Sequence, residues 1–491
     1  MVGPRKPTRP TGPKPPRKPS RGPAKGPPKP ENSQAVTPAS QRPPRPRSGS
    51  GPRTADGPRP SIVKGQRPTD GARPRPVPRP VPRTGARPSR PLILPRVERP
   101  ARQAPILPGD LPDLGQLPSL LAQHVAAHYT PHRFEKATLP LERIHRDALL
   151  QLSGLFTSER PDLPAGYLTQ PKYRGAYLLY FVPTGVATMM TVLRDSLAWP
   201  PSPDRKPLRV LDIASGPLTA SLAVALLLPP DVPLEVTAID ASGPILDDGR
   251  TLMRQIRPDA VVHTLSGNLR EGRLLRDLKG RFDLILMANF LNEWSVGGRK
   301  KQEPGEFVEK VMVDHLAEGG AAVLVEPATR TASHHLIAVR EHIVENTGIA
   351  LLGPCLGTMP CPLGAASMRD WCHAERPWER PPMVVALDEA IGHRRSTLKY
   401  SWLALGDRGQ PVPAPNKYRA VGGPMRAAGA FRRYLCGPEG RVVALFEDDR
   451  VPATLRDAWR GQSVVVTGDL SIARRGPYEE TVLRPQTPQR R

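Results

Sequence analysis

Residues 208–221 read LRVLDIASGPLTAS, and this stretch decides the fold class. Its apolar first half predicts a buried strand over residues 208–213, and the small residues that follow predict a tight turn into a helix. Similar apolar runs recur between helical segments, at LEVTAID (234–240), FDLILMANFL (282–291) and GGAAVLVEPA (319–328). Continuous Val, Ile and Leu are typical of strands buried on both faces of a parallel sheet. The sequence therefore predicts an α/β fold with a doubly wound, Rossmann-like sheet.

The ends of three predicted strands carry residues suited to a nucleotide. Asp212 ends the first strand, and the loop Ala214-Ser215-Gly216-Pro217 lets the backbone approach a ligand at a helix N-terminus. Asp240 ends the second strand, where an acid would hydrogen-bond both hydroxyls of a ribose. Gly267-Asn268 ends the third strand and would flank an adenine. The predicted cofactor-binding residues are Asp212, Ala214, Ser215, Gly216, Asp240 and Asn268.

The motif selects among nucleotide ligands. It lacks the G-x-G-x-x-G spacing that closes on a dinucleotide pyrophosphate and the Gly-Lys-Ser/Thr of a P-loop. It fits the class I fold for S-adenosylmethionine (SAM), with residues 282–294 as the fourth strand and its turn and residues 316–328 as the fifth strand. Leu218 stands where that motif usually has its third glycine. The alternative is a scaffold that has kept the sheet and lost tight SAM binding.

The turn after the fourth strand carries the candidate catalytic residues, which are Asn289, Asn292 and Glu293. An enzyme that methylates exocyclic amines would have an Asn/Asp-Pro-Pro-aromatic turn here, and a cytosine-C5 enzyme would have a cysteine beside this strand. This chain has neither, so a flipped base would be held by polar contacts and by stacking on Trp294. The alternative is a helix start with Trp294 in a core.

The first hundred residues differ in composition from the rest of the chain. Of the 491 residues, with a net charge of +25, this stretch holds about 24 of the 71 Lys and Arg and about 28 of the 65 prolines. So polar a segment cannot bury a core, and it predicts a disordered, partly polyproline arm over 1–108. Such an arm would bind RNA or DNA without sequence preference; the alternative is a solubilising tail. Its prolines disfavour a mitochondrial presequence, which needs an amphipathic helix.

Further boundaries follow from changes of pattern. Apolar residues at helical spacing predict a helical lead-in over 109–199, with one break at Pro183-Thr184-Gly185. The Rossmann-like domain is predicted over 200–350, a cysteine-cluster and β-rich RNA-binding module over 351–478, and a tail over 479–491. The module includes the β-like stretch TLKYSWLAL (397–405). No run of eighteen apolar residues and no secretory signal is found, so we expect a soluble intracellular protein without a membrane contact.

All four cysteines, Cys355, Cys361, Cys372 and Cys436, lie in the C-terminal third, which favours one four-thiolate site. A reducing cytosol disfavours two disulfides. The spacing C-x5-C-x10-C-x63-C is a poor match for zinc knuckles, whereas Fe–S clusters accept irregular spacing. His373 is a possible zinc ligand.

Short motifs around these cysteines resemble a known family. They are Pro360-Cys361-Pro362-Leu363, Trp371-Cys372-His373, Tyr418-Arg419 and Arg432-Arg433-Tyr434-Leu435-Cys436. The chain is similar, over about residues 120–470, to the methyltransferase-like family of ribosomal small-subunit assembly factors, whose mitochondrial members are known as the Rsm-twenty-two or methyltransferase-like-seventeen type. It departs from the family pattern at Leu356-Gly357 and at Ala374.

This resemblance implies a [4Fe–4S] cluster held by the four cysteines, a SAM-binding domain, and binding to small-subunit rRNA during ribosome assembly. Asp212, Gly216 and Asp240 would hold SAM. We expect a monomer off the ribosome, in a bacterial-type cytoplasm or alternatively in the mitochondrial matrix. Two other functions stay open: a catalytically inactive assembly factor that uses the SAM fold to dock on RNA, and a zinc-stabilised nucleic-acid-binding protein.

Basic and aromatic residues crowd the segment around the cysteines, which predicts an RNA-binding surface, since Arg binds phosphate and aromatic rings stack on unpaired bases. The alternative is a solvated charged face. The basic residues are Arg376, Arg380, Arg394, Arg395, Lys399, Lys417, Arg419, Arg426, Arg432 and Arg433, and the aromatic residues are Trp378, Tyr400, Tyr418 and Tyr434.

Overall fold

The computed structural model describes residues 112–131, 139–157, 164, 166–196, 199, 207–269, 272–291, 303–365, 370–406, 414–427, 430–466, 470–475 and 480–485. The chain divides into two units, Met1–Leu94 and Pro95–Arg491, and all of these residues belong to the second. The predicted arm over 1–108 lies outside the described residues, as do Asn292, Glu293 and Trp294.

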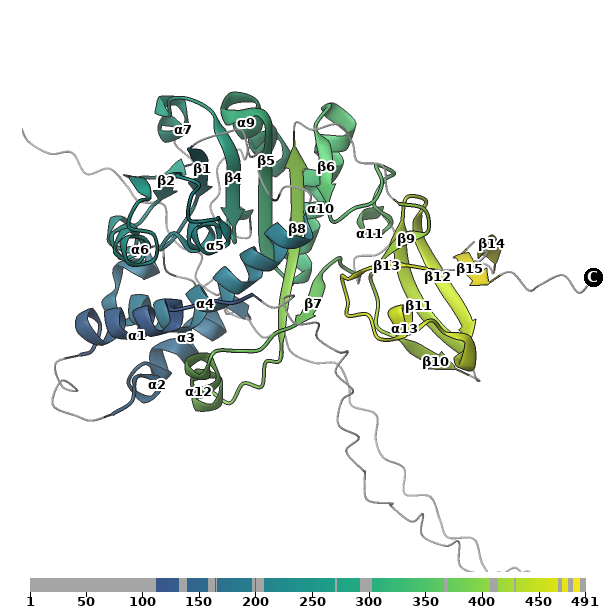
Figure 1. The fold of residues 1–491 in the computed structure, drawn as a ribbon, viewed down its shortest axis with the longest axis horizontal. Coiled ribbons are helices and arrows are strands. Elements are labelled where there is room, and N and C mark those ends of the chain that lie inside the picture. The colour runs from purple at the N-terminus through teal and green to yellow at the C-terminus, as the bar shows by residue number, and fades with distance from the viewer. Residues whose placement is uncertain are drawn as a thin grey trace, which may run out of the picture. The chain divides into compact units, whose positions relative to one another are not determined.

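The larger sheet has eight strands (Figure 1). They are β1 Leu208–Ile213, β2 Leu234–Asp240, β3 Val261–Ser266, β4 Phe282–Ala288, β5 Leu316–Pro327, β6 Ala350–Gly353, β7 Ala374–Pro377 and β8 Thr397–Gly406. The order is β3-β2-β1-β4-β5-β8-β6, with β7 beside β8. Strands β1 to β5 pair in parallel, whereas β8 runs antiparallel to β5, β6 and β7. A reversed strand inserted before the last one is the arrangement of the class I SAM-methyltransferase sheet, so the predicted fold class is confirmed.

Helices cover both faces of this sheet. They are α1 Leu117–His128, α2 Leu141–Ile144, α3 Arg146–Thr157, η3 Tyr167–Thr169, α4 Pro171–Asp195, α5 Thr219–Leu227, α6 Gly243–Ile256, α7 Arg273–Asp277, α9 Pro304–His315, α10 Arg330–Asn346, α11 Pro362–Ala365 and α12 Pro382–Ala390. Alternate residues of β1 enter different cores: Val210 packs with α4, α5 and α6, and Leu211 packs with α9 and α10. The predicted helical lead-in therefore forms part of one face of the fold.

Helix α4 runs without a break from Pro171 to Asp195, so the predicted break at Pro183-Thr184-Gly185 is wrong. The glycine serves close packing and not a break, because a Cβ on Gly185 would lie 2.7 Å from the Thr219 side chain of α5. By length and composition α4 is the one described helix that resembles a membrane span, but 72% of its most apolar window is buried. Such burial is typical of the core helix of a folded domain.

The second sheet has seven strands, in the order β13-β9-β11-β12-β15-β14 with β10 beside β11. They are β9 Lys417–Ala420, β10 Met425–Ala427, β11 Ala430–Gly437, β12 Gly440–Glu447, β13 Ser463–Val465, β14 Leu470–Arg475 and β15 Glu480–Pro485, and η5 Asp448–Arg450 and α13 Ala453–Arg456 connect β12 to β13. The pairs are antiparallel apart from β12 with β15. Tyr418, Leu435 and Phe446 lie in its own apolar core.

Two predicted boundaries do not coincide with the ends of the sheets. The larger sheet continues past residue 350 to Gly406, because the stretch 397–405, predicted for the C-terminal module, forms β8 of the larger sheet. Residues 480–485, predicted as tail, form β15 and pair with β12. Both strands are β-like in sequence, but the sheet that a strand joins depends on partners that lie far away along the chain.

Candidate functional site

The loop after β1 adopts a conformation that favours glycine at alternate positions. Ala214, Gly216 and Leu218 have φ of 55°, 54° and 57°. A left-handed conformation costs a residue with a Cβ roughly 1–2 kcal/mol, so the fold holds this loop against local preference. Leu218 is fully buried, and a Cβ on Gly249 of α6 would lie 2.5 Å from its Cδ1. Gly249 thus makes room for the leucine that replaces the third glycine.

The two acids of the predicted cofactor site brace this loop. Asp212 Oδ2 accepts hydrogen bonds from the hydroxyl and backbone N–H of Ser221, at 2.7 and 3.1 Å, and burial raises the pKa of Asp212 to about 7. Asp240 Oδ2 accepts from Gly216 N and Asp240 Oδ1 from Ser242 N, both at 2.9 Å, and burial raises the pKa of Asp240 as well. Asp240 therefore lies at the end of β2, directly beside the loop.

A cavity of ≈ 270 Å³ opens where β1, β4 and β5 end. Ala214, Ser215 and Asn289, three of the predicted site residues, line it. Asn289 follows β4 with φ of 58° and donates its backbone N–H to Val325 O of β5, at 2.7 Å. Asp212, Asp240 and the exposed Asn268 do not line this cavity. The cavity therefore lies beside the carboxyl ends of the parallel strands, where open α/β sheets bind their ligands.

An aromatic wall of Phe156, Tyr167, Tyr177 and Phe181 bounds the cavity on the side of α3, η3 and α4. Phe156 makes edge contacts with Phe181 and Tyr167, at 4.9 and 5.5 Å between ring centroids. Tyr177 stacks on Phe181 at 5.5 Å. All four residues are partly exposed, so their rings are accessible from the cavity. We call these four residues the aromatic wall.

Glu326 is a candidate functional residue that the sequence analysis missed. Among the described residues that line the cavity it is the one carboxylate, and it is 1% exposed. Its Oε1 accepts the backbone N–H of Leu291 at 2.7 Å, which joins the ends of β4 and β5. The available signal was an acidic residue near the C-terminal end of a buried apolar strand, in the stretch LVEPA (324–328).

The structure brings the four cysteines together from both sheets. Cys355 follows β6, Cys361 precedes α11, Cys372 precedes β7, and Cys436 lies in β11 of the second sheet. Burial, with the charges of the other thiols, raises the pKa of Cys355, that of Cys361 to about 11 and that of Cys436 to about 12. Within the described ranges, no group of three or more His, Cys, Asp or Glu is placed to hold a metal ion. The thiols thus converge without a ligating geometry.

Two arginines lie among these thiols. Arg419 is 4% exposed, and its Nη1 donates to Cys372 Sγ at 3.0 Å while its Nε donates to Gly461 O at 3.1 Å. Arg340 is 3% exposed, and its Nη2 donates to Gly357 O and Met359 O, at 2.9 and 2.7 Å. These two guanidinium groups partly oppose the effect of burial on the pKa of Cys355, and their positive charge would balance an anionic group bound to the sulfur atoms.

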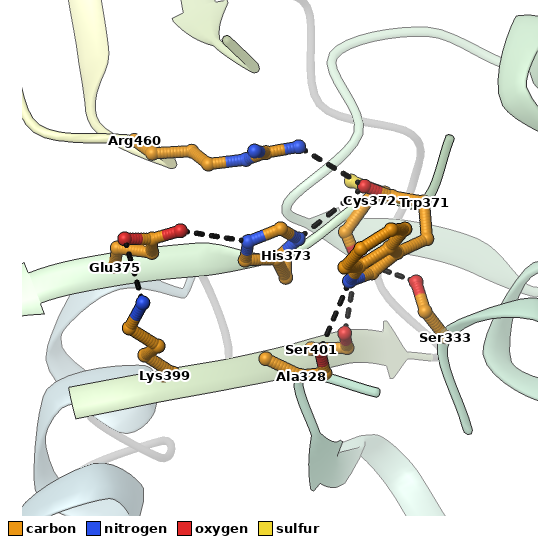
Figure 2. Close-up of polar contacts among 9 residues, drawn as sticks. All are labelled: Ala328, Ser333, Trp371, Cys372, His373, Glu375, Lys399, Ser401 and Arg460. Carbon is orange, nitrogen blue, oxygen red and sulfur yellow. Dashed lines mark hydrogen bonds and ion pairs between the residues drawn. The ribbon is translucent and has the colours of Figure 1, made fainter. Parts of the chain in front are cut away.

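Figure 2 shows the polar contacts of residues 371–375, the segment that carries Cys372. Trp371 Nε1 donates to Ala328 O at 2.9 Å, beside the lining residues Pro327 and Thr329. The carbonyl of Cys372 accepts from Ser333 Oγ and Ser401 Oγ, at 2.5 and 2.9 Å. The segment is therefore bonded to α10 and β8 as well as to the floor of the cavity.

The predicted basic surface is wrong for three of its arginines, which are buried. Arg376 donates through one nitrogen to both oxygens of Asp195, at 3.0 Å each, and Arg419 contacts Cys372. Arg433, 1% exposed, donates to Leu455 O and Ala458 O. Trp378, Tyr400 and Tyr418 are buried too. The long side chains reach acceptors that sequence proximity does not reveal, whereas Arg394, Arg395 and Lys399 remain exposed.

Comparisons with known proteins give one family and a set of distant structures. The sequence model of the family described as Rsm22, "Mitochondrial small ribosomal subunit Rsm22", matches residues 172–447. No curated sequence matches the chain.

Several of the similar solved structures are methyltransferases by title, at low similarity. One is precorrin-6y C5,15-methyltransferase from Geobacter metallireducens, with 14% identity, covering 45% of this chain and 86% of that one, TM-score 0.27. Another is an O-methyltransferase from Bacillus cereus in complex with SAH, with 11% identity, covering 58% of this chain and 99% of that one, TM-score 0.27. A third is TrmN from Thermus thermophilus, with 17% identity, covering 46% of this chain and 52% of that one, TM-score 0.27. Scores this low assign no substrate.

Proposed function

The chain belongs to the Rsm22 family of mitochondrial small ribosomal subunit proteins, and from this premise we propose that it is a SAM-dependent methyltransferase-like factor that binds small-subunit rRNA and assists ribosome assembly. The family description supports association with the small subunit. It also supports the mitochondrial alternative for location, whereas a bacterial-type cytoplasm and a monomeric state stay predictions.

One observation carries the SAM proposal: the loop after β1 keeps left-handed conformations at Ala214, Gly216 and Leu218 and lines a cavity at the ends of parallel strands. Two of these residues are not glycine, so the conformation is maintained at a cost. The positive end of the α5 dipole, at Thr219 and Ala220 on the cavity surface, would attract the carboxylate of SAM, and Asp240 would bind its ribose.

The sulfonium of SAM supplies a good leaving group, so the chain's part in transfer is mainly positioning. Asn289 and Glu326 lie at the ends of β4 and β5, on the cavity surface. In this proposal the amide of Asn289 orients the acceptor and the carboxylate of Glu326 accepts its proton.

Titration calorimetry of the full chain with S-adenosylhomocysteine (SAH) tests the binding step. Gly216→Asp, next to the SAM carboxylate, should weaken SAH binding at least about 10-fold, or about 1.4 kcal/mol. Gly272→Asp is the matched control, because Gly272 also has a positive φ, 66°, and a Cβ there meets nothing within 4 Å. Absence of SAH binding to the folded wild-type chain would overturn the SAM proposal. Methyl mapping of rRNA from a deletion strain then tests transfer.

A scaffold without SAM is the second candidate, and the bonding of Asp240 favours it. Both of its oxygens already accept backbone N–H groups, from Gly216 and Ser242. A chain that cosediments with small subunits, binds no SAH and leaves every rRNA methyl group unchanged on deletion would establish this function instead.

For the cysteine site we propose a [4Fe–4S] cluster held by Cys355, Cys361, Cys372 and Cys436. Support comes from the type of donor, because four thiols from two sheets lie near one another and the buried Arg419 and Arg340 would balance negative charge, although the sulfur atoms of the described residues are not arranged as metal ligands. When bound, the cluster would supply cross-links that fasten β11 to the segment between β6 and β7. The zinc-stabilised alternative predicts a colourless protein with stoichiometric zinc.

A further inference from the structure

The cavity has a cationic side that the proposed SAM site does not use. Among the described residues that line it, Arg395 and Lys399 are the two cations. Arg395 comes just before β8 and Lys399 lies in β8, whereas the SAM loop follows β1. The nearest predicted partner of SAM's carboxylate is the start of α5, so these two cations are available for a second anion.

Both cations are held in place by the fold. The guanidinium of Arg395 lies over the Tyr180 ring, 5.5 Å from its centroid. Lys399 on β8 and Glu375 on β7 are direct cross-strand partners, and Lys399 Nζ lies 3.2 Å from Glu375 Oε2. A free lysine side chain loses conformational entropy when it binds a ligand. The pairing with Glu375 already restricts Lys399, so less entropy is lost on binding.

Glu375 is itself fixed by the segment that carries Cys372 (Figure 2). Its Oε1 lies 3.0 Å from His373 Nε2, and the His373 ring stacks on Trp371 at 5.4 Å between centroids. Trp371 is bonded to Ala328 at the cavity floor. The position of Lys399 is therefore set by residues 371–375 rather than by solvent, although its side chain is 57% exposed.

We propose that Arg395 and Lys399 bind a backbone phosphate of a single-stranded RNA whose base stacks on the aromatic wall, and that Glu375 positions Lys399. This deepens the proposed function, since it names the group of the acceptor that the cavity recognises. Aromatic rings bind unpaired bases by stacking, and paired cations bind the adjoining phosphate. Glu326 and Asn289 line the same cavity that the base would enter.

Photo-crosslinking of the full chain to a ten-nucleotide RNA containing 4-thiouridine tests this arrangement, with the crosslinked peptides mapped by mass spectrometry. Wild type should crosslink within the aromatic wall. Lys399→Ala should lower this yield at least about fivefold, and Lys399→Arg should restore it to within about twofold. Crosslinks to residues 1–108 serve as an internal measure of total RNA bound.

The matched control is Lys310→Ala. Lys310 is 63% exposed and pairs with Asp314 at 2.6 Å on α9, on the other face of the sheet, so wall crosslinks should be unchanged. Equal yields for Lys399→Ala and Lys310→Ala would overturn the proposal. Wall crosslinks absent from the wild type would overturn it as well.

SAH calorimetry separates the two possible anions. If Lys399→Ala weakens SAH binding tenfold and leaves the wall crosslinks intact, the cation holds the cofactor's carboxylate and the RNA assignment is wrong. A wild type that crosslinks through the wall but binds no SAH would sink the SAM proposal and keep this one.

The role of Glu375 has its own readout. Glu375→Ala, which releases Lys399, should lower the wall yield about threefold, and Glu375→Gln, which keeps an acceptor for the ammonium, should recover most of it. A gain of crosslinking in Glu375→Ala would show that Glu375 only neutralises Lys399 and would overturn its positioning role.

Discussion

The loop beside the cavity is defined by its backbone conformation, whereas the cysteine site is defined by its side chains. The cavity depends on the backbone of consecutive β-α units, and it keeps its loop geometry with Ala214 and Leu218 at positions that favour glycine. The cysteine site depends on four side chains spread over residues 355–436 and two sheets. A loop whose function depends on its backbone can tolerate a changed side chain when a neighbour makes room, as Gly249 does for Leu218. A site that depends on four particular side chains loses a ligand with each substitution.

The largest effect is therefore expected at a cysteine. Cys436→Ser should remove nearly all iron, sulfide and visible absorbance from protein purified without oxygen, because hard oxygen is a poor replacement for a thiolate. Ser463→Ala, at an exposed position of β13 in the same sheet, should keep the wild-type content. Retention of full iron by Cys436→Ser would remove Cys436 from the ligand set, and one zinc per chain in the wild type would replace the cluster by zinc.

The backbone site predicts a smaller, pH-dependent effect. The pKa of Asp212 is about 7 in the folded chain against 3.8 for a free aspartate, so in this window the folded state holds a proton that the unfolded state has lost. Stability from this group is then greatest at low pH and falls as the pH rises towards about 7. Asp212→Asn mimics the protonated form, so between pH 5 and pH 8 the wild type should lose roughly 3 kcal/mol relative to this variant.

Urea unfolding across pH measures that difference. Asp231→Asn, at an exposed turn, should run parallel to the wild type at every pH. If the free energies of unfolding of the wild type and of Asp212→Asn change in parallel with pH, Asp212 is ionised in the folded chain and its negative charge accepts the hydrogen bonds from Ser221.

Compensation by Gly249 can be tested directly. Gly249→Ala would place a Cβ 2.5 Å from Leu218 Cδ1 and 2.6 Å from the Pro217 carbonyl carbon, so it should lower the free energy of unfolding by about 2 kcal/mol. Gly243→Ala in the same helix meets nothing nearer than Ser266 Oγ at 3.6 Å and should be neutral or slightly stabilising. Equal stability of the two variants would mean that Leu218 moves freely and that α6 makes no special room for it.

The smallest effect should come from relieving the loop itself. Ala214→Gly removes a Cβ at φ of 55° and should stabilise the fold by up to about 1 kcal/mol. Ala225→Gly, the same change inside α5, should destabilise it by a similar amount. Thermal melts of both variants give the sign, and a loss of stability in Ala214→Gly would contradict the strain assigned to this loop.

The sequence predicted the strands whose signal is local and missed features that depend on distant partners. The buried runs at 208–213, 234–240 and 282–288 are strands of the doubly wound sheet, because strands covered on both faces are apolar throughout. The pairing of β8 with β5 depends on register across seventy residues of chain, and no local pattern encodes it. Likewise, Arg376 and Arg433 read as surface charge, although both are buried and bonded to Asp195, Leu455 O and Ala458 O.

The candidate site divides in the same way. Ala214, Ser215 and Asn289 were predictable, since each ends a strand or starts a turn in the SAM-type motif. The aromatic wall was not, because its rings come from helices of the lead-in that pack over the sheet only in three dimensions. The convergence of the four cysteines matches the expectation from their scarcity, and the ligand they hold stays a prediction.

Strand β8 also sets an order of events during synthesis. It fills the place between β5 and β6, so β6, which pairs only with β8 among the described strands, cannot join the sheet until residues 397–406 have left the ribosome. Until β8 pairs, residues 354–396, with three of the four cysteines, are not held to the sheet at their C-terminal end. Contacts of such long sequence separation form late. A nascent chain would therefore complete its larger sheet first and acquire its cysteine site only after Cys436 has followed.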